Sequence, residues 1–313
     1  MFQKTGTLLT AVLLGLTATV ATAAPAVAAP ADVAGGTLSV GKLILKPTER
    51  GYRGSVPVTV TNTGSETDYL YYKLREPVPG AFQFDGTVCD MFDMRVEDNR
   101  RVATCSLTDN WAYLAPGESI RNVLDFHVLT NPRTYPMIMA GGWVEVYSSN
   151  SGLVASTPLS ALFRSTNGSL IRPRPYVQDA QPDASIRLNG PVTEFPGGEG
   201  NLRVPLTIRY GGDAPHGSFW VQARSLPAGS VLRSADPGTG PVGSDGVLVP
   251  VPELQLMPGE EFSFAVVISP PTDPADTTKL VDIELTTSWY PETPDVDPSD
   301  NVVQTRLAVA ANG

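Results

Sequence analysis

Short runs in which apolar and polar residues alternate recur along the chain. The run Val56–Val60 alternates valine with Pro or Thr, and the run Val204–Tyr210 alternates large apolar residues with Pro, Thr or Arg. Neighbouring side chains on a strand point to opposite faces, so a period of two predicts strands with one buried face. Helical periodicity is missing, and Gly and Pro separate the runs. About seven short strands in roughly 130 residues predict an all-β chain of two-sheet sandwiches.

Four short phrases occur twice in the same order, at offsets of 148, 149, 142 and 139 positions. They pair Val56–Val60 with Val204–Ile208, Pro77–Ala81 with Leu226–Ser230, Leu114–Val128 with Leu256–Ile268, and Val144–Val146 with Ile283–Leu285. A single repeated phrase could arise by chance, but four repeated phrases in the same order indicate two copies of one domain with loops of unequal length. The Pro-Gly-Glu of the third pair predicts a surface turn that leads into a core strand.

The chain is predicted to divide into four segments. These are a signal peptide at 1–28, a first β-sandwich domain at 32–166, a linker at 167–183 and a second β-sandwich domain at 184–313. About 285 mature residues suit two domains. Three prolines among polar residues between Ser165 and Ser185 predict a short, stiff linker.

The first residues have the pattern of an export signal. Lys4 gives a positive head, Thr7–Val20 is mostly apolar, and small-residue cleavage motifs end at Ala23 and Ala28. A membrane-spanning helix needs about 20 apolar residues, more than this run offers. We therefore expect a secreted, extracellular protein without a membrane span.

Charge and cysteine usage narrow the function classes. Without the signal, 21 basic residues face 32 acidic ones, which disfavours nucleic acid and anionic membranes as partners. Cys89 and Cys105 lie 16 positions apart, and an even pair in an exported chain favours a disulfide over a metal site or a nucleophile. A loop of that size predicts a stabilisation of about 3 kcal/mol.

Three phrases carry a resemblance to a known family. "VTVTNTGSETDYL" (58–70), "LAPGES" (114–119) and "DVDPSDNVV" (295–303) resemble the bacterial extracellular immunoglobulin-like repeats, including the cell-adhesion-related domain found in bacteria. The resemblance covers both halves through degenerate motifs, since the first and third phrases each occur in one half. It implies immunoglobulin-like sandwiches that act as spacer, adhesion or accessory modules, and it implies no catalytic residues.

Candidate catalytic residues are few. The two histidines are His127, expected on an outward strand face with Arg121 and Asp125, and His216 in the loop "GGDAPHGS". The sequence has no G-x-S-x-G, no H-E-x-x-H and no phosphate-binding glycine loop. We therefore predict a protein that is not an enzyme and needs no cofactor. The alternative is a small secreted hydrolase with a loop carboxylate site, because carboxylates are numerous.

The acidic phrase "DVDPSDN" raises a calcium hypothesis. Asp295, Asp297 and Asp300 offer hard oxygen ligands within a short loop. The EF-hand spacing fails, however, and Asp and Asn also favour plain turns. We expect a turn here, with metal as the weaker alternative.

Outward aromatic residues are the candidate binding surface. Aligning "DYLYYKLRE" with "GSFWVQARS" places Tyr71 and Trp220 at the same outward strand position. The predicted set is Tyr69, Tyr71, Trp143, Tyr147 and Trp220. Exposed aromatics beside polar groups suit contact with a protein or a cell-surface polysaccharide. The alternative is cross-strand aromatic pairing that braces the sheet, and we consider it the stronger of the two.

Overall fold

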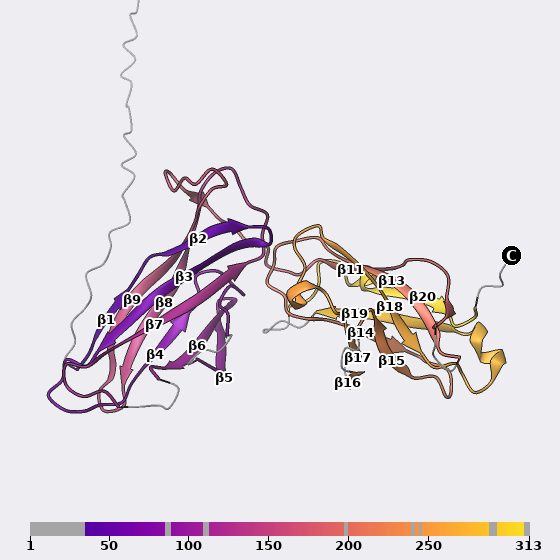
Figure 1. The fold of residues 1–313 in the computed structure, drawn as a ribbon, viewed down its shortest axis with the longest axis horizontal. Helices are drawn as coiled ribbons and strands as arrows, with labels where there is room; N and C mark the ends of the chain where they lie inside the picture. Colours follow the sequence, from indigo (N-terminus) through magenta and orange to yellow (C-terminus); the bar gives the residue numbers. More distant parts are fainter. Residues whose placement is uncertain are drawn as a thin grey trace, which may run out of the picture.

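The computed structural model describes residues 35–84, 89–108, 113–196, 200–238, 242–243, 246–287 and 293–309. The fold is all-β, with several sheets distributed over two lobes (Figure 1). We call residues 35–176 the N-terminal lobe and residues 184–309 the C-terminal lobe. The predicted signal peptide at 1–28 lies outside the described residues. Within the described ranges, no helix has the length and apolar character needed to cross a membrane.

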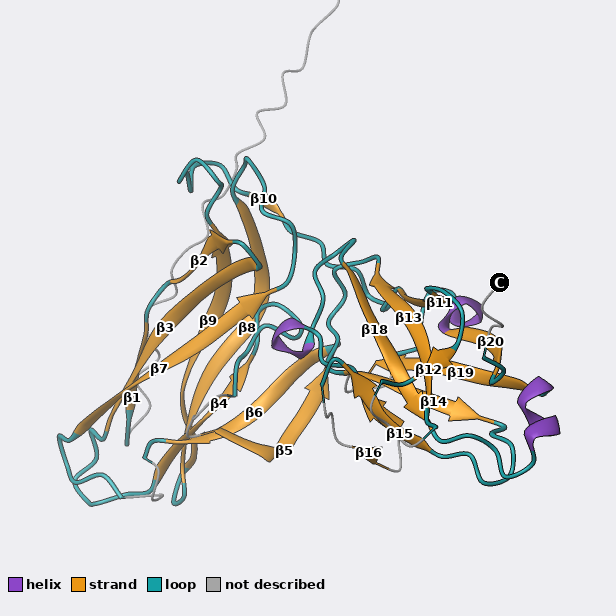
Figure 2. Ribbon diagram, turned by 45° about the vertical axis from the view of Figure 1, so that its right-hand side comes forward, coloured by secondary structure: helices purple, strands orange, loops and turns teal. Residues whose placement is uncertain are grey.

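Among its described residues, the N-terminal lobe has ten strands. They are β1 (Thr37–Val40), β2 (Leu43–Thr48), β3 (Gly51–Thr61), β4 (Leu70–Arg75), β5 (Cys89–Glu97), β6 (Arg100–Ser106), β7 (Ser119–Val128), β8 (Met137–Ser148), β9 (Gly152–Phe163) and β10 (Arg174–Pro175). Their order is β1-β3-β2-β9-β8-β4-β6-β5, with β7 paired to β3 and β10 to β8. One layer holds β1, β3 and β7, the other holds β9, β8, β4, β6 and β5, and a common apolar core involves residues of both (Figure 2).

Strand β2 connects the two layers and positions one end of the lobe. Its first half, Leu43–Leu45, pairs in parallel with β9, and its second half pairs antiparallel with β3. Where the strands approach, a Cβ on Gly54 would lie 2.3 Å from the main-chain oxygen of Ile44, so only glycine fits. The turn between β2 and β3 places Arg50 against the C-terminal lobe, where its guanidinium contacts Gln255 and Glu260.

The described part of the C-terminal lobe contains two five-stranded sheets. Its elements are β11 (Ala184–Leu188), β12 (Thr193–Glu194), β13 (Leu202–Tyr210), β14 (Phe219–Arg224), β15 (Leu232–Asp236), β16 (Val242–Gly243), β17 (Gly246–Leu248), β18 (Glu261–Ile268), β19 (Leu280–Thr287), β20 (Val302–Arg306) and the short 3-10 helices η1 (Pro252–Leu254), η2 (Pro274–Thr278) and η3 (Pro298–Asn301). One sheet runs β11-β13-β18-β15, with β12 beside β13, and the other runs β16-β17-β14-β19-β20. Their inward residues share one core, as in a β-sandwich.

The recurring phrases lie on strand pairs with matching registers. Val56 of β3 faces Leu124 of β7, and Val204 of β13 faces Val266 of β18. These partners keep the sequence offsets of 148 and 142 positions. The β4–β8 and β14–β19 pairs match in the same way, at offsets of 149 and 139. Alternating β-branched residues favour such strands because their side chains pack well on a pleated surface.

The two Pro-Gly-Glu turns also have the same geometry. Gly117 has φ 79° and donates its N–H to the carbonyl oxygen of Asn62 at 2.7 Å, and Gly259 has φ 82° and donates to Tyr210 at 2.6 Å. Glycine is favoured at both positions because a Cβ is strained at positive φ. As the turn chemistry predicted, each turn leads into a strand with core residues.

Each lobe has its own hydrophobic core. The N-terminal cluster runs from Leu38 to Tyr176 and the C-terminal cluster from Ala184 to Leu307. Tyr176 falls within the predicted linker, but its ring packs 4.7 Å from that of Phe163, and β10 pairs with β8. Residues up to Tyr176 therefore complete the N-terminal core.

Because the cores are separate, we expect fragments covering residues 35–178 and 182–309 each to unfold cooperatively. Each fragment keeps every described strand of its lobe and loses the contacts at the junction. Calorimetry of both fragments beside the whole chain is the measurement. Two fragments without a cooperative transition would show that stability depends on contacts across the junction.

Candidate functional site

Three tyrosines form a stacked ladder on the outer face of β4 and β8. Tyr69 precedes β4, Tyr71 lies on it, and Tyr147 lies directly opposite Tyr71 on β8. The ring centroids of Tyr69 and Tyr71 are 5.9 Å apart, and those of Tyr71 and Tyr147 are 5.4 Å apart, with nearly parallel planes. All three residues are half-buried. The predicted Tyr69, Tyr71 and Tyr147 are therefore brought together, and we call them the tyrosine ladder.

Neighbouring side chains cover much of the ladder. The Tyr113 ring meets Tyr69 edge-on at 5.7 Å and is itself 66% exposed. The ammonium nitrogen of Lys73 lies 4.9 Å from the centroid of the Tyr147 ring, a cation–π contact. Because each ring of the ladder lies against another ring or Lys73, the ladder offers ring edges and polar groups more than free ring faces.

The hydroxyl of Tyr147 is held in its neutral, donating form. It donates to Glu145 Oε2 at 2.7 Å. Burial raises the pKa of Tyr147 to about 12, with further contributions from the hydrogen bond and the charge of Glu145. Burial and the neighbouring tyrosines also raise the pKa of Tyr69. At neutral pH the phenols of Tyr69 and Tyr147 therefore stay protonated and uncharged.

The two predicted tryptophans lie apart from the ladder. Trp143 on β8 is half-buried and faces Arg75 and Pro158 on the adjacent strands. Trp220 on β14 is also half-buried, between Thr286 and Leu248. Where Tyr71 meets Tyr147, Trp220 meets a threonine. On β4 and β8 the paired residues Tyr71 and Tyr147 stack, whereas on the corresponding strands β14 and β19 Trp220 is paired with Thr286.

The acidic loop around η3 is a capped turn. Asp295 accepts the main-chain N–H groups of Ala184 and Asp297 at 2.9 and 3.0 Å, and Asp297 accepts that of Ser299 at 3.1 Å. Burial and the charges of Asp297 and Asp295 raise the pKa of Asp300. In the described part of the chain, no three acidic, histidine or cysteine side chains are grouped to hold a metal ion. Main-chain capping accounts for Asp295 and Asp297, and the calcium hypothesis for Asp295, Asp297 and Asp300 stays a prediction.

His127 lies on the outward face of β7, as expected, but that position is not open to solvent. The His127 side chain is only 3% exposed, because the loop that carries Glu253 covers it from the C-terminal lobe. Its Nε2 lies 2.6 Å from the carbonyl oxygen of Arg50, so Nε2 carries the proton, and Nδ1 lies 3.7 Å from Glu253. Asp125 is exposed to solvent, whereas His127 is buried against the C-terminal lobe.

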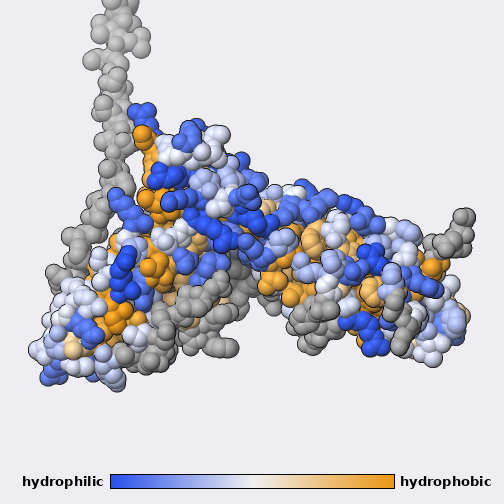
Figure 3. All heavy atoms as spheres, viewed as in Figure 1, coloured by the Kyte–Doolittle hydropathy of each residue, from blue (hydrophilic) through white to orange (hydrophobic). Residues whose placement is uncertain are grey.

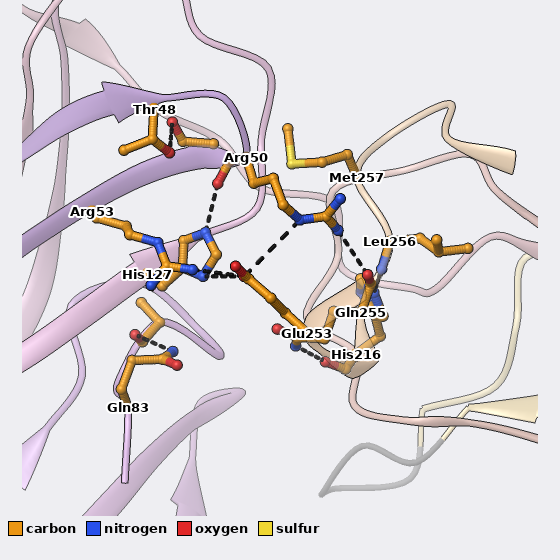
Figure 4. A network of polar contacts seen from close by, with 12 residues as sticks. Thr48, Arg50, Arg53, Gln83, His127, His216, Glu253, Gln255, Leu256 and Met257 are labelled. Atoms are coloured by element: carbon orange, nitrogen blue, oxygen red, sulfur yellow. Dashed lines mark hydrogen bonds and ion pairs between the residues drawn. The ribbon is translucent and has the colours of Figure 1, made fainter. Parts of the chain in front are cut away.

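Arginines of the N-terminal lobe bind acceptors of the C-terminal lobe (Figure 4). Arg50 donates to Glu260 Oε1 at 3.0 Å and to the carbonyl oxygen of Gln255 at 2.8 Å, and Arg53 donates to Glu253 at 2.6 Å. Hydrophilic residues gather where the lobes meet in the space-filling view (Figure 3). We call this contact the junction.

Asp213 holds the second side of the junction. Its carboxylate accepts hydrogen bonds from Thr130 Oγ1 at 2.7 Å and from the Tyr176 hydroxyl at 2.8 Å, both of the N-terminal lobe. It also accepts the main-chain N–H of Asp179 in the connecting segment at 2.9 Å. Burial and the charge of Asp213 raise the pKa of Tyr176, which stays a donor. The lobes are therefore tied by side chains as well as by the chain itself.

The sequence offered no pattern for most junction residues. Arg50 and Asp213 lie in turns or loops and Glu253 lies in the short helix η1, so none of them belongs to a run of alternating residues. The sequence offered one signal, which is that both histidines lie close to aligned phrases. His127 lies near the end of the phrase Leu114–Val128, and His216 directly precedes the aligned phrase "GSFWVQARS". That signal does not reveal that the two come together.

Comparison with known proteins adds no named relative. No family model matches the chain, and no curated protein matches it. Among solved structures, one match is a protein of unknown function from Porphyromonas gingivalis W83. It shares 14% sequence identity, covers 86% of this chain and 97% of its own, and has a TM-score of 0.23.

Proposed function

We propose that this chain is a secreted, non-catalytic binding or adhesion protein made of two tandem immunoglobulin-like β-sandwiches. The duplication is supported by strand pairs whose registers match at the offsets of the repeated phrases. The extracellular role is supported by the export pattern and by the bonded pair Cys89–Cys105. The immunoglobulin-like assignment rests on the resemblance and on the paired sheets.

The tyrosine ladder is the observation that carries a binding role. It combines three half-buried phenols with Lys73, Glu145 and the exposed Tyr113 on one sheet face. Tyrosine is enriched at protein interfaces, where a rigid ring adds contact area and its hydroxyl adds a hydrogen bond. Since the rings stack on one another, they leave little free face for a sugar. We therefore assign the ladder to a protein partner at the cell exterior.

Replacing Tyr71 with alanine is expected to weaken binding of that partner at least about fivefold, since truncating an interface anchor costs 1 kcal/mol or more. The matched control is Trp220→Ala, which alters the corresponding strand of the other lobe. Extracellular proteins captured on the immobilised mature chain are identified, and one is purified for titration against both variants. Purified cell-wall polysaccharides form a parallel arm.

Three results would count against the proposal. Equal binding by Tyr71→Ala and wild type would place the partner elsewhere. A large fall in melting temperature with intact binding would make the ladder a brace of the sheet. Polysaccharide binding that Tyr71→Ala abolishes would assign the surface to a sugar.

A further inference from the structure

The chain has two histidines, and both lie at the junction. His127 comes from β7 of the N-terminal lobe and His216 from the loop between β13 and β14 of the C-terminal lobe. Both are buried, at 5% and 2% exposure, and both line one cavity of about 20 Å³. The junction therefore brings together the two imidazoles of this protein, one from each lobe. Because an imidazole can gain a proton in mild acid, this contact can respond to a fall in pH.

Hydrogen bonds assign the proton of each imidazole. His216 Nε2 accepts the main-chain N–H of Leu256 at 3.1 Å, so Nε2 is bare and the proton lies on Nδ1, facing the carbonyl oxygen of Ala214 at 3.3 Å. In His127, by contrast, the bare atom is Nδ1, which faces Glu253. A second proton on His127 therefore meets a carboxylate. On His216 it meets an N–H donor and breaks a hydrogen bond.

The bond from Leu256 helps to hold the loop that joins the lobes. Residues 252–257 carry Glu253, which pairs with Arg53, and Gln255, whose carbonyl oxygen accepts from Arg50. The side chain of Gln255 donates to the carbonyl oxygen of His216, a second tie to the same residue. Glu253 and Leu254 have φ of 54° and 60°, a left-handed conformation that costs non-glycine residues free energy. The loop is thus strained and depends on its contacts.

We propose that His216 is an acid-sensitive latch. A proton on its Nε2 removes the hydrogen bond to Leu256, releases the loop at residues 252–257 and lets the two lobes separate. The bonds from Arg50 to Gln255 and from Arg53 to Glu253 are lost with the loop, because both acceptors move with it. Above neutral pH the latch is closed and the lobes are held in one arrangement.

Surrounding groups set the direction of the response. The titratable or charged groups that face His216 are Tyr210 of β13, Arg50 of the β2–β3 turn, His127 of β7 and Asp213 of its own loop. Burial lowers the pKa of His216 to about 4, the backbone hydrogen bond to Ala214 opposes that shift, and the charge of Arg50 adds to it. Tyr210 is neutral, since burial and nearby aspartates raise its pKa. Burial also lowers the pKa of His127, with Arg53 and Arg50 adding to the effect and Glu253 opposing it.

The sign follows from proton linkage. The closed junction holds imidazoles whose pKa lies below the ordinary value of about 6.5, so it binds fewer protons than the open form. Its stability is therefore complete above about pH 6.5 and falls as the pH drops toward 4. Within that window, each pH unit lowers the ratio of closed to open molecules up to tenfold for His216 alone.

Small-angle X-ray scattering and proton NMR of the mature chain, without a histidine tag, test the latch between pH 7.5 and 5.0. This range stays above the isoelectric point of about 4.7. We expect the largest molecular dimension to grow as the pH falls, with the His216 imidazole titrating in step. His216→Gln removes the larger of the two titrations, so its dimensions should change much less with pH than those of the wild type. His127→Gln, the matched control, should keep most of the wild-type opening, because the larger shift belongs to His216.

Three results overturn the latch. One is an unchanged scattering profile from pH 7.5 to 5.0. The second is a His216→Gln protein that opens like wild type. If that variant does not fold, wild-type NMR decides: a His216 imidazole that titrates at an ordinary pKa, or separately from the scattering change, removes the proposed cause.

Discussion

Replacing Glu76 with glutamine is expected to lower the free energy of unfolding of the N-terminal lobe by about 3–5 kcal/mol. The Glu76 carboxylate is 1% exposed and pairs with Arg101, whose side chain is 13% exposed. It accepts both Nε and Nη2 of that guanidinium and the main-chain N–H groups of Gly80, Phe82 and Arg101, at 2.9 to 3.2 Å. A neutral amide removes the negative charge that faces the Arg101 guanidinium and turns an NH₂ group toward donors.

An exposed ion pair provides the matched control for this substitution. Arg187 and Glu261 lie 2.9 Å apart with side chains 57% and 48% exposed, so Glu261→Gln should cost less than about 1 kcal/mol. Calorimetry distinguishes the lobes, because Glu76→Gln should shift the N-terminal transition and leave the C-terminal one in place. A loss below about 1 kcal/mol for Glu76→Gln would mean that water reaches the pair.

Removal of the disulfide is expected to lower the unfolding free energy of the same lobe by about 3 kcal/mol. Cys89 and Cys105 face each other across β5 and β6, with Cα atoms 3.8 Å apart, so the predicted pairing has the required proximity. Their separation of 16 residues sets the size of the loop that the bond closes. β5 pairs only with β6 among the described strands, so the bond also holds an edge strand in place.

The double variant Cys89→Ala with Cys105→Ala and the wild type under reducing conditions should give the same loss in chemical denaturation. The C-terminal lobe has no cysteine, so its transition is the internal reference. A double variant that unfolds like the oxidised protein would show that β5 and β6 are held by packing alone. Free thiols in the unreduced, denatured protein would contradict the bond itself.

The sequence alone predicted the all-β class, the buried faces of several strands and the cysteine pair. Alternating apolar residues indicate a buried face, because every second side chain of a strand points to the same side of the sheet. Val56, Val58 and Val60 are accordingly buried at 0, 1 and 0% exposure. The repeated phrases lie on strand pairs with matching registers. A shift of the pairing by one residue would turn every apolar side chain of a strand to solvent, so the apolar pattern fixes the register. The cysteine pairing was predicted from the even number of cysteines and from the expected export of the chain.

Only the tertiary structure decided what lies between the lobes and how the aromatics meet. His127 lies on an outward face, as alternation requires, yet it is buried because Glu253, 126 positions later, covers it. Likewise, the ladder formed because β4 and β8 pair Tyr71 with Tyr147, while the matching strands pair Trp220 with Thr286. Periodicity encodes the two faces of a sheet, but contacts between loops and between separate sheets depend on the path of the backbone. No local pattern of residues carries that information.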